Sequence, residues 1–173
     1  MMRDPSSSRT EGCCRGSREV SAQSPTDIGL DVCECAILDV SRHFFCAYTE
    51  TEVPHWERAL KLAVDHFRTE DGPAIAISVL NVLSAMRSTR RNVFRFNSPY
   101  CPKCKKKITA SECNLMRSIH FARRSQRSVG EMEALILCEG HSADRLMLAI
   151  DQLIAFLPTP MEGSAINERA SLH

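Results

Sequence analysis

The sequence lacks the features that mark several large protein classes. No apolar run approaches the ~18 residues of a membrane-spanning helix, and residues 1–27 lack the apolar stretch of a secretory signal. Only seven glycines occur, and none is clustered at a strand-to-helix transition, so a phosphate-cradling loop is not indicated. No nucleophile motif or paired-carboxylate pattern accompanies the dispersed histidines. We therefore expect a protein that is not an enzyme and has no membrane association.

Cysteine is abundant but does not form the pattern of a disulfide scaffold. The chain has nine cysteines, an odd number, spread unevenly over 173 residues. Secreted disulfide-rich domains are shorter and richer in turns, and the helical patterns of this chain do not require covalent cross-links. These features favour a reducing compartment, and the expected location is cytoplasmic.

Apolar residues recur at helical spacing along most of the chain, and no segment strongly predicts a sheet. Residues 74–80 could pass for a buried strand, but the apolar pattern continues too far beyond them for a strand. The predicted fold class is all-α: a small domain of about six helices with a Cys-rich loop and disordered N- and C-terminal tails. The expected divisions are a disordered extension at 1–27, a helical domain at 28–157 and a flexible tail at 158–173. The expected helices span residues 30–48, 54–68, 74–90, 110–124, 128–138 and 143–156.

Positive charge is concentrated in the middle of the chain. Between Arg87 and Arg127 there are twelve Lys or Arg residues and a single acid, Glu112, so this segment carries about +11. The remainder, with ten basic and twenty acidic residues, carries about −10. A block of one sign predicts a binding surface for nucleic acid or another polyanion, or for an acidic protein partner.

A Cys-x-x-Cys pair inside this block, Cys101 and Cys104, predicts one half of a zinc site. Cys138-Glu-Gly-His141 is the favoured second half, because the glycine permits a turn that brings sulfur and imidazole together. Four protein ligands would make the zinc structural and would tie the basic loop to a helix junction. Cys113 is the reserve ligand. The alternative is that Cys138 packs in the core and His141 is an exposed neighbour of a helix end.

The expected helix at 110–124 has two faces when its residues are placed at ~100° intervals. Leu115, Ile119 and Ala122 form the apolar face. The opposite face is basic, and its simplest interpretation is a surface exposed to solvent. A second alternative is that the acidic segment 27–71, with ten acids and four bases, docks against this face within the chain or in a dimer. The basic side chains expected to lie along phosphates are those of that face, Arg117, His120, Arg123, Arg124 and Arg127, together with Lys103, Lys105, Lys106 and Lys107 of the loop.

Three functions are compatible with these patterns. The first is a small intracellular metal-binding helical protein that acts by binding, as a nucleic-acid-binding regulator using residues 87–127. The second is a protein-interaction adaptor or oligomerising helical module, a homodimer included, with no nucleic-acid role. The third is a thiol redox switch at Cys101 and Cys104.

Overall fold

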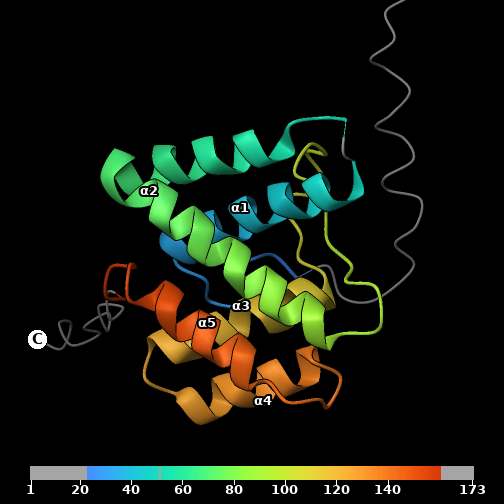
Figure 1. Cartoon of the computed structure of the whole chain (residues 1–173), viewed down its shortest axis with the longest axis vertical. Helices are drawn as coiled ribbons and strands as arrows, with labels where there is room; N and C mark the ends of the chain where they lie inside the picture. Colours follow the sequence, from blue (N-terminus) through green and yellow to red (C-terminus); the bar gives the residue numbers. More distant parts are fainter. Residues whose placement is uncertain (1–22, 51, 161–173) are drawn as a thin grey trace, which may run out of the picture.

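The computed structural model describes residues 23–50 and 52–160, and this part of the chain folds into helices without any strand (Figure 1). The prediction of an all-α fold is confirmed. None of these helices is long and apolar enough to cross a bilayer. The five helices are α1 (Val32–Thr49), α2 (His55–Thr89), α3 (Ala110–Arg123), α4 (Arg127–Leu137) and α5 (Asp144–Ile154).

The described part contains five helices where about six were expected, because two expected helices join in α2. The helix is interrupted at Arg68, whose φ of 71° and ψ of 164° are not helical. After this break the chain turns back, and Gly72 packs against the backbone of Ala63 and Val64 in the first half of α2. A Cβ atom at Gly72 would lie 2.6 Å from the Cα of Val64, so only glycine fits there. The two halves of α2 consequently run in different directions, as Figure 1 shows.

Local sequence signals determine where two of the helices begin. Thr109 and Glu112 form the capping box predicted at the start of α3. Asp31 and Glu34 form a second capping box at the start of α1. A similar signature before α4 is not used, because this helix begins at Arg127 without a side-chain cap.

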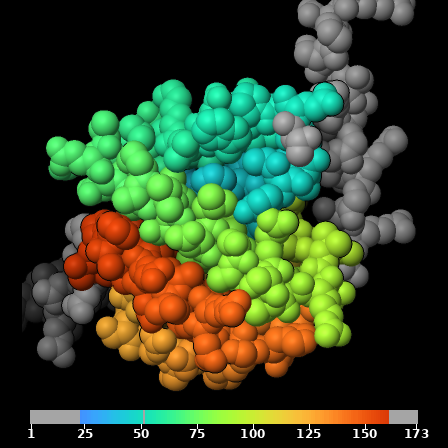
Figure 2. Space-filling view, in the orientation of Figure 1, coloured from blue at the N-terminus to red at the C-terminus, as the bar shows by residue number. Residues whose placement is uncertain are grey.

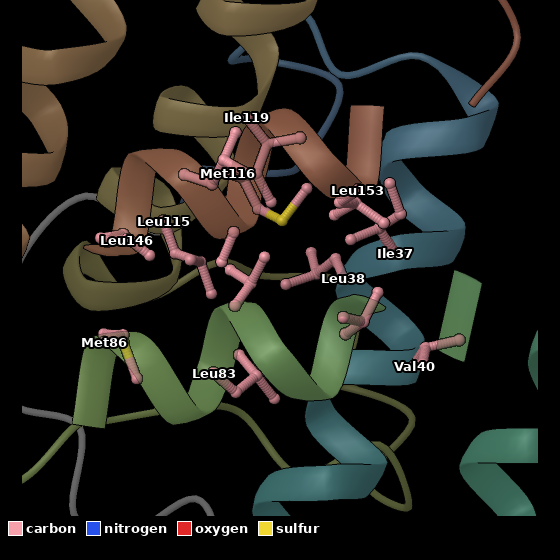
Figure 3. Packing of buried hydrophobic residues seen from close by; sticks show 14 of the residues in the cluster. Ile37, Leu38, Val40, Leu83, Met86, Leu115, Met116, Ile119, Leu146 and Leu153 are labelled. Carbon is pink, nitrogen blue, oxygen red and sulfur yellow. The ribbon is translucent and has the colours of Figure 1, made fainter. Parts of the chain in front are cut away.

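The core lies where α1, the second half of α2, α3 and α5 meet. Figure 3 shows their side chains converging, among them Ile37 from α1, Leu83 from α2 and Leu115 from α3. α5 lies against the second half of α2 on the face shown in Figure 2. α4 packs mainly on α3 at the margin of this bundle, and it contributes Ala134 and Leu137 to the core.

Both predicted tails lie largely outside the described residues. Positions 1–22 and 161–173 are among those not described. Gln23, within the predicted N-terminal extension, accepts a hydrogen bond from the N–H of Ile108 at 3.0 Å. Pro158, within the predicted C-terminal tail, accepts one from Arg123 at 2.8 Å. The described ends are therefore attached to the helical domain.

Candidate functional site

Arg42 of α1 is the side chain that holds the basic loop. It is 1% exposed, and its Nε lies 2.7 Å from Oε1 of Glu112, which is fully buried. Its guanidinium also donates to the main-chain carbonyls of Lys105 at 2.8 Å and Lys107 at 2.6 Å. Glu112 accepts a further hydrogen bond from the N–H of Asn97 at 3.0 Å. One buried ion pair therefore joins α1, α3 and both ends of the loop.

The Cys-x-x-Cys segment itself is a tight turn. The N–H of Cys104 donates to Sγ of Cys101 at 3.4 Å, and the N–H of Lys105 donates to the Cys101 carbonyl at 2.9 Å. Cys101 is buried and Cys104 is half-buried. Hydrogen bonds within the segment make the turn compact.

The other predicted zinc ligands do not join this turn. Cys138 is fully buried, and its Sγ accepts a hydrogen bond from Thr89 at 3.3 Å. Nδ1 of the exposed His141 lies 3.0 Å from the Cys138 carbonyl. In Figure 1 the tip of the yellow loop lies beside the start of α2, whereas the orange α4–α5 connection lies at the opposite end of the molecule.

The reserve ligand does not complete a metal site either. Cys113 is half-buried on α3, and burial raises the pKa of its thiol. Within residues 23–50 and 52–160, no group of three or more His, Cys, Asp or Glu side chains is arranged to hold a metal ion. Among the described residues, the predicted ligands therefore do not form a zinc site.

Three members of the predicted basic face contact acids at the start of α1. Nη1 of Arg123 lies 2.7 Å from Asp31 Oδ2 and 2.8 Å from Glu34 Oε1. Nη1 of Arg124 lies 2.6 Å from the same Glu34 oxygen, and Nδ1 of His120 lies 3.0 Å from Glu34 Oε2. The pairing suits both helices, since acids are stabilised at a helix N-terminus and cations at a C-terminus. These side chains point into an intramolecular contact.

The two carboxylates of this contact stay ionised at neutral pH. Burial raises the pKa of Glu34, but hydrogen bonds from His120, the Asp31 backbone and Arg124 outweigh burial, so the pKa lies below its ordinary value of 4.5. Burial also opposes ionisation of Asp31, yet the Glu34 backbone and Arg123 hold its pKa below 3.8. The acids therefore neutralise Arg123 and Arg124.

The remaining two arginines of the basic face also lie beside acids. Nε of Arg117 is 2.8 Å from Oε1 of Glu133. Arg127 contacts Glu131 at 2.9 Å and Asp151 at 2.6 Å. The face that was expected to lie along phosphates is thus engaged in ion pairs within the chain. For the acids near Asp31, this is the alternative in which the acidic segment 27–71 docks against the basic face.

The four lysines of the loop are arranged differently. All are exposed, and within the described part of the chain none forms an ion pair with a carboxylate. The chain has only one other lysine, Lys61, and it lies 2.9 Å from Asp65 on α2. We call Lys103, Lys105, Lys106 and Lys107 the loop lysines.

A polar cluster beside the loop was not predicted. The hydroxyl of Tyr100 lies 2.6 Å from Nδ1 of His55 and 3.1 Å from Nδ1 of His43. Nε2 of His55 lies 3.3 Å from Glu50 Oε2. A carboxylate only accepts hydrogen bonds, so a neutral His55 carries its proton on Nε2 and accepts from the tyrosine hydroxyl. Arg58 covers the Tyr100 ring at 5.2 Å from the centroid.

This cluster connects the start of α2 and the face of α1 to the basic loop. Burial lowers the pKa of His43, and the nearby Arg58 and Lys105 act in the same direction, so the ring is neutral at pH 7. Positions 43, 55 and 100 have no common spacing in the sequence. Only the adjacency of Tyr100 to Cys101 could have drawn attention to it.

Comparison with known proteins gives no further guide to this site. No protein-family model matches the chain. No curated protein and no solved structure is significantly similar to it.

Proposed function

We propose that this protein binds the phosphate backbone of nucleic acid through the loop lysines. The observation that carries this function is the contrast between the two groups of cations. The arginines of α3 and α4 lie beside carboxylates, whereas the four loop lysines are exposed and have no carboxylate partner in residues 23–50 and 52–160. Their charge is therefore available to an external anion.

The way the loop is held supports this function. Arg42 donates hydrogen bonds to the main-chain carbonyls of Lys105 and Lys107, and the side chains of these lysines are exposed. Holding the backbone in advance lowers the conformational entropy lost on binding. Glu112 neutralises Arg42, so Arg42 adds no net charge beside the loop lysines.

Lysine is suited to backbone contacts without base specificity. Its ammonium is a point charge on a flexible stem and needs no bidentate geometry. Phosphate contacts position a protein on nucleic acid but do not read its sequence. We therefore expect affinity for single- and double-stranded nucleic acid with little sequence preference.

Fluorescence anisotropy with labelled 20-nucleotide single strands and duplexes tests this function. For the whole chain, four phosphate contacts predict a slope of log affinity against log salt of about −3 to −4. Combining Lys103→Gln, Lys105→Gln, Lys106→Gln and Lys107→Gln should weaken binding about 100-fold at 50 mM salt and flatten the slope. The matched control is Lys61→Gln, the one lysine outside the loop, which should bind as the wild type does.

Two results would contradict nucleic-acid binding. One is a quadruple variant that binds as tightly as the wild type. The other is a wild-type protein that does not bind nucleic acid at 50 mM salt but binds polyglutamate. This result would assign the loop lysines to an acidic protein partner.

A further inference from the structure

The two cysteines of the basic loop are held by the same tight turn. The N–H of Cys104 donates to Sγ of Cys101 at 3.4 Å, so this sulfur lies against the main chain of Cys104. The N–H of Lys105 donates to the Cys101 carbonyl at 2.9 Å and closes the turn. Cα atoms three residues apart in a turn lie within about 7 Å of each other, and a disulfide joins Cα atoms about 4.4–6.8 Å apart. The turn therefore suits a bond between the two sulfurs with little movement of the main chain.

The surroundings of the turn favour reaction at these sulfurs. Lys103 lies between the two cysteines in the sequence and Lys105 follows them, and both lysines are exposed. Nearby positive charge stabilises a thiolate, which is the form of cysteine that attacks a disulfide. The hydrogen bond from the Cys104 N–H stabilises a negative sulfur on Cys101 in the same way.

Four other cysteines of the described chain are less suited to this chemistry. Burial raises the pKa of Cys33 to about 11, and it also raises the pKa values of Cys35 and Cys113. Cys138 is fully buried in the core. Thiols that are buried in apolar surroundings stay protonated and react slowly.

We infer that Cys101 and Cys104 interconvert between two thiols and a disulfide by exchange with a small-molecule disulfide of the glutathione type. Cys104 is the attacking residue, because it is half-buried whereas Cys101 is only 6% exposed. The Cys104 thiolate attacks one sulfur of the small molecule, whose S–S bond breaks and releases one thiolate. The Cys101 thiolate then attacks the Cys104 sulfur and releases the second thiolate. The protein is oxidised by two electrons, and the two released thiolates take up the two protons that the cysteines lost.

The small size of the ring makes this bond reversible. It contains only the four residues 101–104. In the chain-entropy account, a disulfide stabilises a protein according to the length of the loop that it closes in the unfolded chain, and this loop is short. We therefore expect small thiols to reduce the bond again. The inference is independent of the proposed nucleic-acid binding, because exchange at the sulfurs leaves the number of loop lysines unchanged.

Tryptic mapping of the whole chain tests the exchange, after exposure of the folded protein to oxidised glutathione and alkylation of the remaining thiols. Trypsin cleaves after Lys103, so a bond between the two cysteines keeps the fragments 96–103 and 104–105 joined. The joined pair should be about 2 Da lighter than the sum of the two fragments. Reduced glutathione should separate them again.

Three serine variants serve as controls. Cys113→Ser is the matched control, since Cys113 and Cys104 are both half-buried, and it should form the bond as the wild type does. Cys101→Ser should stop after the first step and retain one glutathione on Cys104. Cys104→Ser should retain none on Cys101, because that sulfur is buried.

Two results would overturn the inference. One is a wild-type map in which the two fragments stay separate, and the other is a bond that joins Cys101 or Cys104 to a different cysteine. Equal retention of glutathione by Cys101→Ser and Cys104→Ser would overturn the order of attack. Far-UV circular dichroism should show wild-type helicity in each variant. The maps of the wild type and Cys113→Ser decide the bond even where a variant of the turn loses helicity.

Discussion

Single buried charges carry much of the contact between α1 and α3. Glu34 is fully buried and accepts from two arginines and a histidine. A buried ion pair is not in itself strong evidence of stability, because desolvation offsets the attraction between the charges. Removing one partner is a different matter, because it leaves the other charge buried and uncompensated.

Glu34→Gln should therefore destabilise the protein by about 3 kcal/mol. Urea unfolding followed by circular dichroism measures the change. The control is Glu131→Gln, which removes one of the two acidic partners of the exposed Arg127 and should cost at most about 1 kcal/mol. Equal losses in the two variants would show that Arg123 and Arg124 do not depend on Glu34.

At the scale of elements, the corner in α2 combines strain with close packing. Arg68 adopts a positive φ with an extended ψ, a region of backbone conformation that is essentially restricted to glycine. Gly72 follows one turn later at the point of contact with Val64. The strain at Arg68 is retained because the packing of both halves of α2 on their neighbours determines the direction of the chain.

Arg68→Gly should stabilise the protein by about 1 kcal/mol, because the relieved backbone strain exceeds the added flexibility of the unfolded chain. Gly72→Ala should have the opposite effect and cost about 2 kcal/mol or more, since its Cβ would collide with backbone atoms that cannot move independently. Thermal unfolding of both variants measures the difference. A destabilised Arg68→Gly protein would mean that the arginine side chain has a role that outweighs its backbone strain.

At the scale of the whole molecule, the near-neutral total charge conceals an internal pairing of opposite regions. The acids at the start of α1 neutralise the end of α3, and Glu112 neutralises Arg42 of α1. The loop lysines belong to the exposed part of the basic block, together with Arg87, Arg91 and Arg95. Stability and the proposed nucleic-acid binding therefore depend on different cations of the same segment.

Acid should unfold the molecule through the α1–α3 contact. The pKa values of Asp31 and Glu34 lie below their ordinary values of 3.8 and 4.5, so the unfolded chain binds more protons than the folded one. Their contribution to stability is complete above these ordinary values and is lost as the pH falls through the lower folded-state values. Urea melts between pH 7 and pH 3 should show this loss, and Glu34→Gln should show a smaller dependence on pH. Identical pH dependence in both proteins would exclude Glu34 as a source of the effect.

The sequence by itself determined the helical class, the approximate helix positions and the start of α3 at Thr109. These features depend on apolar periodicity and capping, which act over a few neighbouring residues. The concentration of lysine in the loop is likewise visible in the sequence. The extent of α2 was not predicted. Asp71 and Gly72 indicate the end of a helix, but they do not show that the chain turns back there and continues as part of the same helix.

Only the tertiary structure decided which distant side chains meet. Helical spacing places Arg123 on a different face of α3 from Leu115, yet it does not reveal that Asp31 and Glu34 cover Arg123. The Cys101 turn is local, whereas its distance from Cys138 depends on how the helices pack. The same holds for Arg42 with Glu112 and for Tyr100 between His43 and His55. Such contacts form because the helices bury a shared core, which brings together residues that are far apart in the sequence. Periodicity along the chain does not predict which of these residues meet.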